Sequence, residues 1–185
     1  LGLSPLAYNF IGGIFDHAPA LCAVMSPTVN CYKRLQVGAS LTGSRSGFLW
    51  TPAFVSYGDN NRTQMIRTAG PGHLEDRTLS AACNPYLAMG AYVTAGLDGM
   101  RRKLDPGEPN LGNLYDLGLE EIGRRGIRLL PQSLAEALDE LRRDELVQES
   151  LGVIYDEFLG LKEGEWREYH RQVTQWELDR YLTMF

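Results

Sequence analysis

The strand-forming sequence of this chain is gathered in one central block, with helix-forming sequence before and after it. Two turn sequences, Gly-Asp-Asn at 58–60 and Gly-Pro-Gly at 70–72, divide the block. We therefore expect three strands, over Phe48–Tyr57, Thr63–Arg67 and His73–Leu79. Because strands and helices are segregated along the chain rather than alternating, the pattern predicts an α+β fold and not an alternating α/β fold.

Helix signals flank the block on both sides. Ser4 is a suitable N-cap and Pro5 suits the first helical position, and apolar residues then recur at helical spacing. We expect this helix to break at Pro19 and a short second helix to follow over Leu21–Met25. A later helix is expected over Tyr86–Lys103, where small residues should allow close approach to a neighbour and burial on most sides. Further helices are expected from a capping box at Ser133 to Arg142, from Asp144 onward, and over the amphipathic stretch Tyr155–Phe185.

Two stretches between these elements are rich in turn residues. Residues 27–46 contain repeated Gly and Ser, so we expect Arg34 at the base of a long irregular loop. Residues 105–116 form a second expected loop, with Tyr115 near its end. Loops of this length are often functional.

Length and charge limit the classes of function. The 185 residues match the usual size of one domain. A formal net charge of −5 would repel a phosphate backbone, which argues against nucleic acid as a partner. No apolar stretch approaches the ~20 residues that a membrane span needs.

The cysteines and the first residues of the chain indicate the cellular compartment of the protein. Cys22, Cys31 and Cys83 form neither a CxxC pair nor an even framework, which predicts packed thiols in a reducing cytoplasm. The chain begins with Leu and shows no secretory leader. We expect it to be a piece of a longer protein.

Arginine is concentrated around the predicted strands. Arg34, Arg62, Arg67 and Arg77 each carry a planar, permanently charged group that matches a carboxylate or a phosphate. An odd spacing would put Arg62 and Arg67 on opposite faces of one straight strand, so we expect Arg62 on the preceding turn and Arg67 on the strand. A salt-bridged sheet accounts for any one of these residues, but the whole group predicts a site for anions.

Glu75 is the acid best placed to bind a metal beside these arginines. It should share a strand face with Arg77, while Asp76 leaves the opposite face. A magnesium site usually needs two or more carboxylates, so residues outside this chain would have to complete it. The histidines are too scattered for a local ligand pair, and we expect surface or packing roles for His17, His73 and His170.

Several segments of the chain resemble the catalytic domain of glutamine synthetase. They match that family in order and spacing over the whole chain, and they are Ser26–Leu35, Asn60–Arg67, Glu75–Arg77, Asn84–Leu87, Ala95–Gly99 and Asn113–Asp116. The resemblance covers only the C-terminal part of that domain, without the N-terminal β-grasp-like domain and the metal-rich half. It implies the C-terminal portion of a glutamine synthetase/guanido kinase-like α+β domain, with a short antiparallel sheet packed with helices.

The resemblance also implies a reaction. In this family the γ-phosphoryl group of ATP passes to the side-chain carboxylate of glutamate, and ammonia or an amine then displaces phosphate. Arg34 and Arg77 would bind glutamate. Arg62 would be catalytic, holding the transferring phosphoryl group and contacting both substrate and ATP. Arg67 would bind the ATP phosphates and Glu75 would be a ligand of Mg²⁺ or Mn²⁺. The complete protein would be a cytoplasmic homo-oligomer, and this piece alone would be inactive.

Three departures from the family pattern bear on the nucleotide and the amine. After Leu35 the chain reads Gln-Val-Gly-Ala-Ser, without the glutamate that guards the ammonium site in the commonest bacterial enzymes. Arg-Thr-Leu-Ser at 77–80 replaces Arg-Phe-Pro-Asp, and Gly70 replaces a nucleotide-contacting lysine. Together with Ser46–Pro52, these features resemble the branch that includes γ-glutamylmethylamide synthetases.

Three hypotheses follow. The first is a ligase that joins ammonia to glutamate, the second a ligase that uses an alkylamine such as methylamine, and the third a catalytically silent domain that binds anions or assembles oligomers. The retained arginines and Glu75 favour a ligase. Tyr115 corresponds to a tyrosine that some family members adenylylate, but we favour a plain loop tyrosine.

Overall fold

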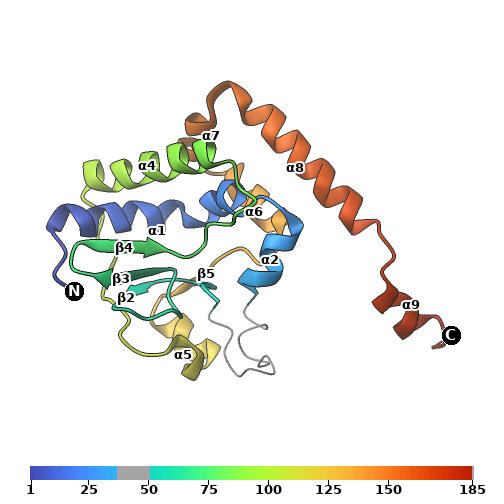
Figure 1. The fold of residues 1–185 in the computed structure, drawn as a ribbon, viewed down its shortest axis with the longest axis horizontal. Helices are drawn as coiled ribbons and strands as arrows, with labels where there is room; N and C mark the ends of the chain where they lie inside the picture. The colour runs from blue at the N-terminus through green and yellow to red at the C-terminus, as the bar shows by residue number, and fades with distance from the viewer. Residues whose placement is uncertain (37–50, 185) are drawn as a thin grey trace.

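The computed structural model describes residues 1–36 and 51–184, which fold into packed helices beside two small sheets (Figure 1). This arrangement confirms the expected α+β class. The predictions that fall on residues 37–50 and on Phe185 lie outside the described residues.

Helix α1, Pro5–Met25, begins as predicted and continues where a break was expected. Ser4 Oγ accepts a hydrogen bond from the Ala7 amide at 3.2 Å. Pro19 lies inside the helix, so the predicted break and the separate second helix are wrong. Proline leaves the carbonyl four residues earlier without its helical donor, and the Arg128 guanidinium donates to that carbonyl, on Phe15. A distant side chain thus satisfies the acceptor that Pro19 leaves unpaired.

Helix α4, Pro85–Arg102, packs closely on α1 through glycines. A Cβ added at Gly13 would lie 2.2 Å from the Ala95 carbonyl oxygen, and one at Gly99 would lie 2.2 Å from the Asn9 carbonyl oxygen. The expected close approach is therefore confirmed. Burial on most sides is wrong, because the helix buries only a stripe of small residues and leaves larger ones exposed, namely Tyr86, Met89, Val93 and Leu97.

The strands form two sheets. β1, Phe54–Val55, pairs antiparallel with β5, Arg128–Leu129, a strand that was not predicted. β2, Tyr57–Gly58, pairs parallel with β3, Ile66–Gly70, and β3 pairs antiparallel with β4, His73–Asp76. The parallel pair departs from the expected antiparallel sheet. The strands also differ from their predicted bounds, since β3 begins later and β4 ends before Arg77.

Helix α2, Val29–Leu35, occupies part of a stretch expected to be loop. Arg34 therefore lies on a helix rather than at the base of a loop. The loop after α4 ends in a short 3₁₀ turn, Leu114–Asp116, followed by α5, Leu119–Arg124.

The C-terminal part of the chain, from residue 134 onward, is helical. α6, Leu134–Leu141, and α7, Glu145–Leu151, begin at the predicted caps Ser133 and Asp144. After a 3₁₀ turn, Gly152–Ile154, come α8, Tyr155–His170, and α9, Gln175–Tyr181. The single long helix expected here is wrong, because Thr174 and Glu177 form a capping box that starts α9. α8 and α9 extend away from the body of the molecule (Figure 1).

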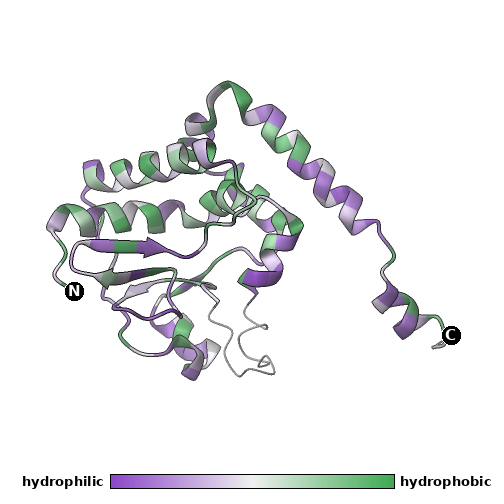
Figure 2. Ribbon diagram, viewed as in Figure 1, coloured by the Kyte–Doolittle hydropathy of each residue, from purple (hydrophilic) through white to green (hydrophobic). Residues whose placement is uncertain are grey.

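The main core lies where α1 meets α4, α6, α7 and the sheets. α1 is hydrophobic over much of its length, whereas hydrophobic and hydrophilic residues alternate along α8 (Figure 2). A smaller cluster lies beneath the 3₁₀ turn and α5, formed by Ala53, Phe54, Leu114 and Ile122. Within residues 1–36 and 51–184, none of the helices has the length and apolar character needed to cross a membrane.

Candidate active site

Arg67 and Glu75 form a two-pronged ion pair across the β3–β4 hairpin. They are direct neighbours in the register of the two strands. Arg67 Nε lies 2.9 Å from Glu75 Oε1, and Arg67 Nη2 lies 2.7 Å from Oε2. Hydrogen bonds from Arg67 hold the pKa of the Glu75 carboxyl below its ordinary value, and the nearby charges of Arg77 and Arg62 act in the same direction. Glu75 is therefore an ionised carboxylate among cations.

Arg77 follows β4 directly and lies on the same side as Glu75. Its Nε is 3.8 Å from Glu75 Oε1, and its Nη1 donates a hydrogen bond to the backbone carbonyl of Arg62. Burial lowers the pKa of the Arg77 guanidinium, and the like charges of Arg67 and Arg62 add to this effect. The expectation that Glu75 and Arg77 share a face is thus confirmed.

Asp76 points away from this group, as predicted. Its side chain is buried, and Oδ1 accepts hydrogen bonds from the Thr78 amide at 2.8 Å and the Thr78 hydroxyl at 2.5 Å. Burial raises the pKa of the Asp76 carboxyl. Asp76 therefore shapes the chain after β4, and Arg34 is the arginine whose charge opposes the raised pKa of its carboxyl.

Arg62 lies on the turn before β3, as predicted, and its side chain is exposed. Asn61 braces this turn, because its side-chain oxygen accepts from the Thr63 amide at 2.9 Å and its side-chain nitrogen donates to the Gly112 carbonyl at 2.6 Å. The turn borders an open pocket of about 600 Å³ lined by Asp59, Asn60, Asn61, Arg62, Arg67, Leu111 and Asn113. Two of the four candidate arginines therefore face one cavity.

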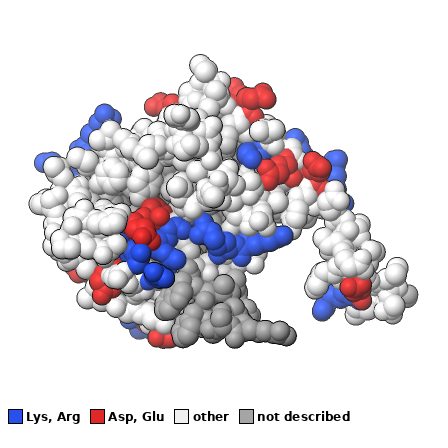
Figure 3. Space-filling model, viewed as in Figure 1, with Lys and Arg blue, Asp and Glu red and all other residues white. Residues whose placement is uncertain are grey.

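Arg34 reaches the same region from α2. Its Nη1 donates to the Arg77 carbonyl at 2.9 Å, and its Nη2 donates to the carbonyls of Thr78 at 2.7 Å and Leu79 at 3.4 Å. The side chain thereby joins α2 to the segment that follows Glu75. Figure 3 shows basic side chains in a band across the middle of this face, with acidic side chains beside one end.

This group, hereafter the arginine cluster, comprises Arg34, Arg62, Arg67, Arg77 and Glu75. Three of its four permanent cations, Arg62, Arg67 and Arg77, act on the one carboxylate, so the cluster carries a surplus of positive charge, and Arg62 and Arg67 line an open pocket. Such a group can bind carboxylates and phosphates. Glu75 suits a hard divalent cation as one ligand, but both of its oxygens face Arg67, and the other acids of the described chain do not gather around it.

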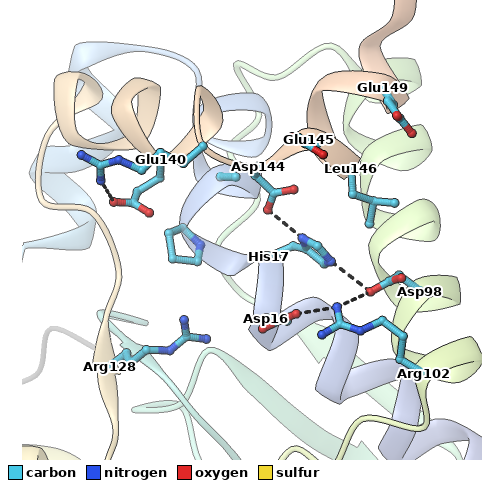
Figure 4. A pocket seen from close by; sticks show the side chains of 13 residues that line it. Asp16, His17, Asp98, Arg102, Arg128, Glu140, Asp144, Glu145, Leu146 and Glu149 are labelled. Atoms are coloured by element: carbon cyan, nitrogen blue, oxygen red, sulfur yellow. Dashed lines mark hydrogen bonds and ion pairs between the residues drawn. The ribbon is translucent and has the colours of Figure 1, made fainter.

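A second charged group, which the sequence did not predict, surrounds His17 (Figure 4). His17 Nδ1 lies 2.6 Å from Asp144 Oδ2, and Nε2 lies 3.2 Å from Asp98 Oδ2. Arg102 Nη1 in turn lies 2.8 Å from both Asp98 Oδ2 and Asp16 Oδ2. This histidine cluster joins α1, α4 and the start of α7. Its members come from three separate segments of the chain and match no sequence motif, so the cluster is evident only from the fold.

The histidine in this cluster has a raised pKa. Burial lowers the pKa of His17, but hydrogen bonds to Asp144 and Asp98 and the charge of Asp144 outweigh burial and raise it above its ordinary value. Both ring nitrogens lie beside carboxylate oxygens, an arrangement that suits the imidazolium form, in which both nitrogens are donors. Asp16, His17 and Asp98 lie close enough to hold a metal ion, but Arg102 already supplies the cation between the two acids.

Tyr115 is half-buried, and its hydroxyl bonds to the backbone of Thr51. Burial raises the pKa of this phenol. These contacts agree with the interpretation of Tyr115 as a packed loop tyrosine. Cys22 and Cys31 are buried free thiols and Cys83 is half-buried, as expected for packed cysteines.

Comparison with known proteins gives consistent results. The family model described as glutamine synthetase, catalytic domain, matches residues 1–181. A glutamate–methylamine ligase from Methyloversatilis universalis is 50% identical over 185 residues, which are 100% of this chain and 41% of that protein. A glutamine synthetase from Thermococcus kodakarensis is 41% identical over 197 aligned positions, covering 98% of this chain and 42% of that protein.

Solved structures agree with the sequence matches. A GmaS/ADP complex superposes with a TM-score of 0.86 at 39% identity, covering 98% of this chain and 40% of that one. A GmaS structure without ligand gives a TM-score of 0.83 at 40% identity, covering 98% and 39%. The chain thus spans about two-fifths of the length of these relatives.

Proposed function

This chain belongs to the glutamine synthetase catalytic domain family, and from that premise we propose that the complete protein is an ATP-dependent ligase that joins methylamine to glutamate. The observation that carries this proposal is the 50% identity to a glutamate–methylamine ligase over the whole chain, against 41% for a glutamine synthetase. The departure after Leu35, where the ammonium-guarding glutamate is missing, supports the same choice. Methylamine, given above as the alternative, is therefore better supported than ammonia.

In the proposed reaction the γ-carboxylate of glutamate attacks the γ-phosphorus of ATP. ADP leaves, and the acyl phosphate so formed is attacked by the amine nitrogen, which loses a proton as phosphate departs. Negative charge passes between oxygens in the first step, and preorganised cations are the main means of stabilising it. The surplus positive charge of the arginine cluster suits this requirement.

The described geometry suggests how the roles divide. Arg62 is exposed at the pocket, so its guanidinium is available for the transferring phosphoryl group. Arg67 would contact ATP phosphates from the same pocket, exchanging its hydrogen bonds to Glu75 for bonds to phosphate. Arg34 and Arg77 would hold the glutamate carboxylate, with Arg34 using donors beyond those that bind the backbone carbonyls of 77–79.

Glu75 is the residue of the arginine cluster that fits a divalent cation. A bound Mg²⁺ or Mn²⁺ would supply Lewis-acid stabilisation of phosphate oxygens. Release of Glu75 from Arg67 would free its oxygens for that cation. The other ligands would have to come from beyond the described residues, and assembly into a cytoplasmic homo-oligomer remains a prediction of the resemblance.

The test is turnover of the complete protein with ATP, glutamate and either methylamine or ammonium. Phosphate release is measured, and the product is identified by mass. Methylamine should give the higher kcat/KM, with γ-glutamylmethylamide as product. A preference for ammonium would restore the glutamine synthetase hypothesis, and no stimulation by either amine would favour the catalytically silent domain.

A further inference from the structure

Helix α2 receives its first-turn cap from a residue far along the chain. The helix has seven residues, and the side chain of Thr28 at its N-cap lies 3.0 Å from Cys31 Sγ and, within the described structure, caps no backbone amide of the first turn. Glu165 Oε1 on α8 instead accepts from the Val29 amide at 3.0 Å. A carboxylate here satisfies an amide without a helical partner and lies at the positive end of the helix.

The Glu165 carboxylate is held in this orientation from its other side. Lys162 Nζ lies 2.9 Å from Glu165 Oε2, and the two side chains are 14% and 30% exposed. A second contact joins the same helices, since Lys33 Nζ lies 5.9 Å from the centre of the Tyr169 ring. α8 therefore contacts both the first and the last turn of α2.

The opposite end of α2 carries Arg34. Its guanidinium binds the carbonyls of Arg77 and Thr78, in the segment that follows Glu75. In a helix this short, fixing the first turn also fixes the last, because few internal hydrogen bonds exist to hold it alone. We propose that Glu165 is a positioning residue that sets where Arg34 presents its guanidinium to glutamate. This inference rests on the proposed function, in which Arg34 binds the substrate carboxylate.

Glu165 is not needed to attach α8 to the rest of the molecule. Glu163 pairs with Arg142 on α6, and Trp166 packs against the main core. Loss of the Glu165 carboxylate should therefore release α2 while α8 stays attached. This separation makes the positioning role testable apart from general stability.

The test compares three variants of the complete protein. Glu165→Ala should raise the KM for glutamate roughly fivefold, the factor that corresponds to the loss of one helix cap, while kcat and the KM for ATP stay near wild type. Glu165→Gln, which keeps an acceptor oxygen, should restore most of the glutamate affinity. Glu163→Ala is the matched control, since it removes the α6 contact and spares α2.

A fourth variant removes the donor of the same hydrogen bond instead of its acceptor. Val29→Pro removes the amide donor at the first helical position, where proline is tolerated, and leaves Glu165 in place. It should raise the KM for glutamate as Glu165→Ala does. An unchanged KM in both variants, or an equal rise in Glu163→Ala, would overturn the positioning role.

Hydrogen exchange of the amides at 29–35 separates this inference from the proposed function, because it needs no turnover. Exchange should quicken in Glu165→Ala and not in Glu163→Ala. If the wild type shows no ligase turnover but exchange changes as expected, the proposed function fails and the capping of α2 stands. Unchanged exchange at 29–35 would contradict the inference itself.

Discussion

The arginine cluster and the histidine cluster contain similar chemical groups but differ in charge balance and exposure. In the first, four arginines accompany one acid, Glu75, and the exposed Arg62 lines an open pocket. In the second, two cations meet three acids between helices, with the side chains of His17 and Asp144 only 11% and 14% exposed. The arginine cluster has a large excess of positive charge and exposes Arg62, which suits ligand binding, whereas the histidine cluster is nearer to charge balance and its central His17 is nearly buried, which suits the joining of helices. The contrast predicts that changes in the first affect activity and changes in the second affect stability.

The largest expected effect is on catalysis. Arg62→Ala should lower kcat of the complete protein by roughly 10²–10³-fold, as for the loss of one donor to a developing charge. The melting temperature should stay close to wild type, because Arg77 binds the backbone carbonyl of Arg62 and not its side chain. Steady-state kinetics and thermal unfolding check both parts. A collapse of the fold would show that Arg62 is structural.

The next effect is on stability. His17→Leu should lower the free energy of unfolding by about 3 kcal/mol, because it leaves Asp144 without its cationic partner in a largely buried place. The KM values and kcat measured at a temperature where the variant is folded should change little. Denaturant unfolding measures the loss of stability. A large fall in kcat with unchanged stability would show that the histidine cluster serves activity rather than stability.

A matched pair of neutral replacements sharpens the comparison. Glu75→Gln should change the free energy of unfolding by less than about 1 kcal/mol, since that side chain is 38% exposed, but should strongly reduce turnover. Asp144→Asn should lower stability by about 1–3 kcal/mol, because it removes a charge that bonds to His17, and should spare turnover. If the two variants changed the free energy of unfolding and turnover equally, the arginine cluster and the histidine cluster would not differ in role.

The smallest effect is a pH dependence of stability. The pKa of His17 is raised in the folded protein. The contribution of His17 to the free energy of unfolding is therefore fully present below the pKa of the unfolded chain, about 6.5, and declines as the pH rises through the pKa of the folded protein. The groups that face it are Asp144, Asp98 and, through Arg102, Asp16. The stability difference between wild type and His17→Leu should therefore shrink as the pH rises above about 6.5. A difference that grows with pH would contradict the assigned protonation.

Local signals in the sequence predicted the helix starts well. Ser4, Ser133 and Asp144 cap helices at the expected positions, because a cap depends on a few adjacent residues. Arg62 on a turn and Arg67 on a strand followed from their spacing. Thr174 and Glu177 also form a local signature, but the long apolar periodicity concealed the break that they mark.

Other elements depended on distant partners and could not be predicted locally. α1 passes through Pro19 because Arg128 supplies a donor from β5, and α2 forms with a cap from α8. β5 exists only as a partner for β1. In each case the stabilising group lies far away in sequence, more than a hundred positions for Arg128 and for the α8 cap, so no local sequence pattern predicts the element.

The sequence by itself determined the α+β class and the family, and it selected the candidate anion-binding residues, because these depend on short segments whose order and spacing are specific. Only the tertiary structure decided which charges meet. It paired Arg67 with Glu75 across a hairpin, placed Arg34 on a helix against the carbonyls after Glu75, and enclosed His17 between carboxylates from two other helices. The physical reason is that charge balance and burial are properties of residues brought together by packing, and no segment of the chain carries them alone.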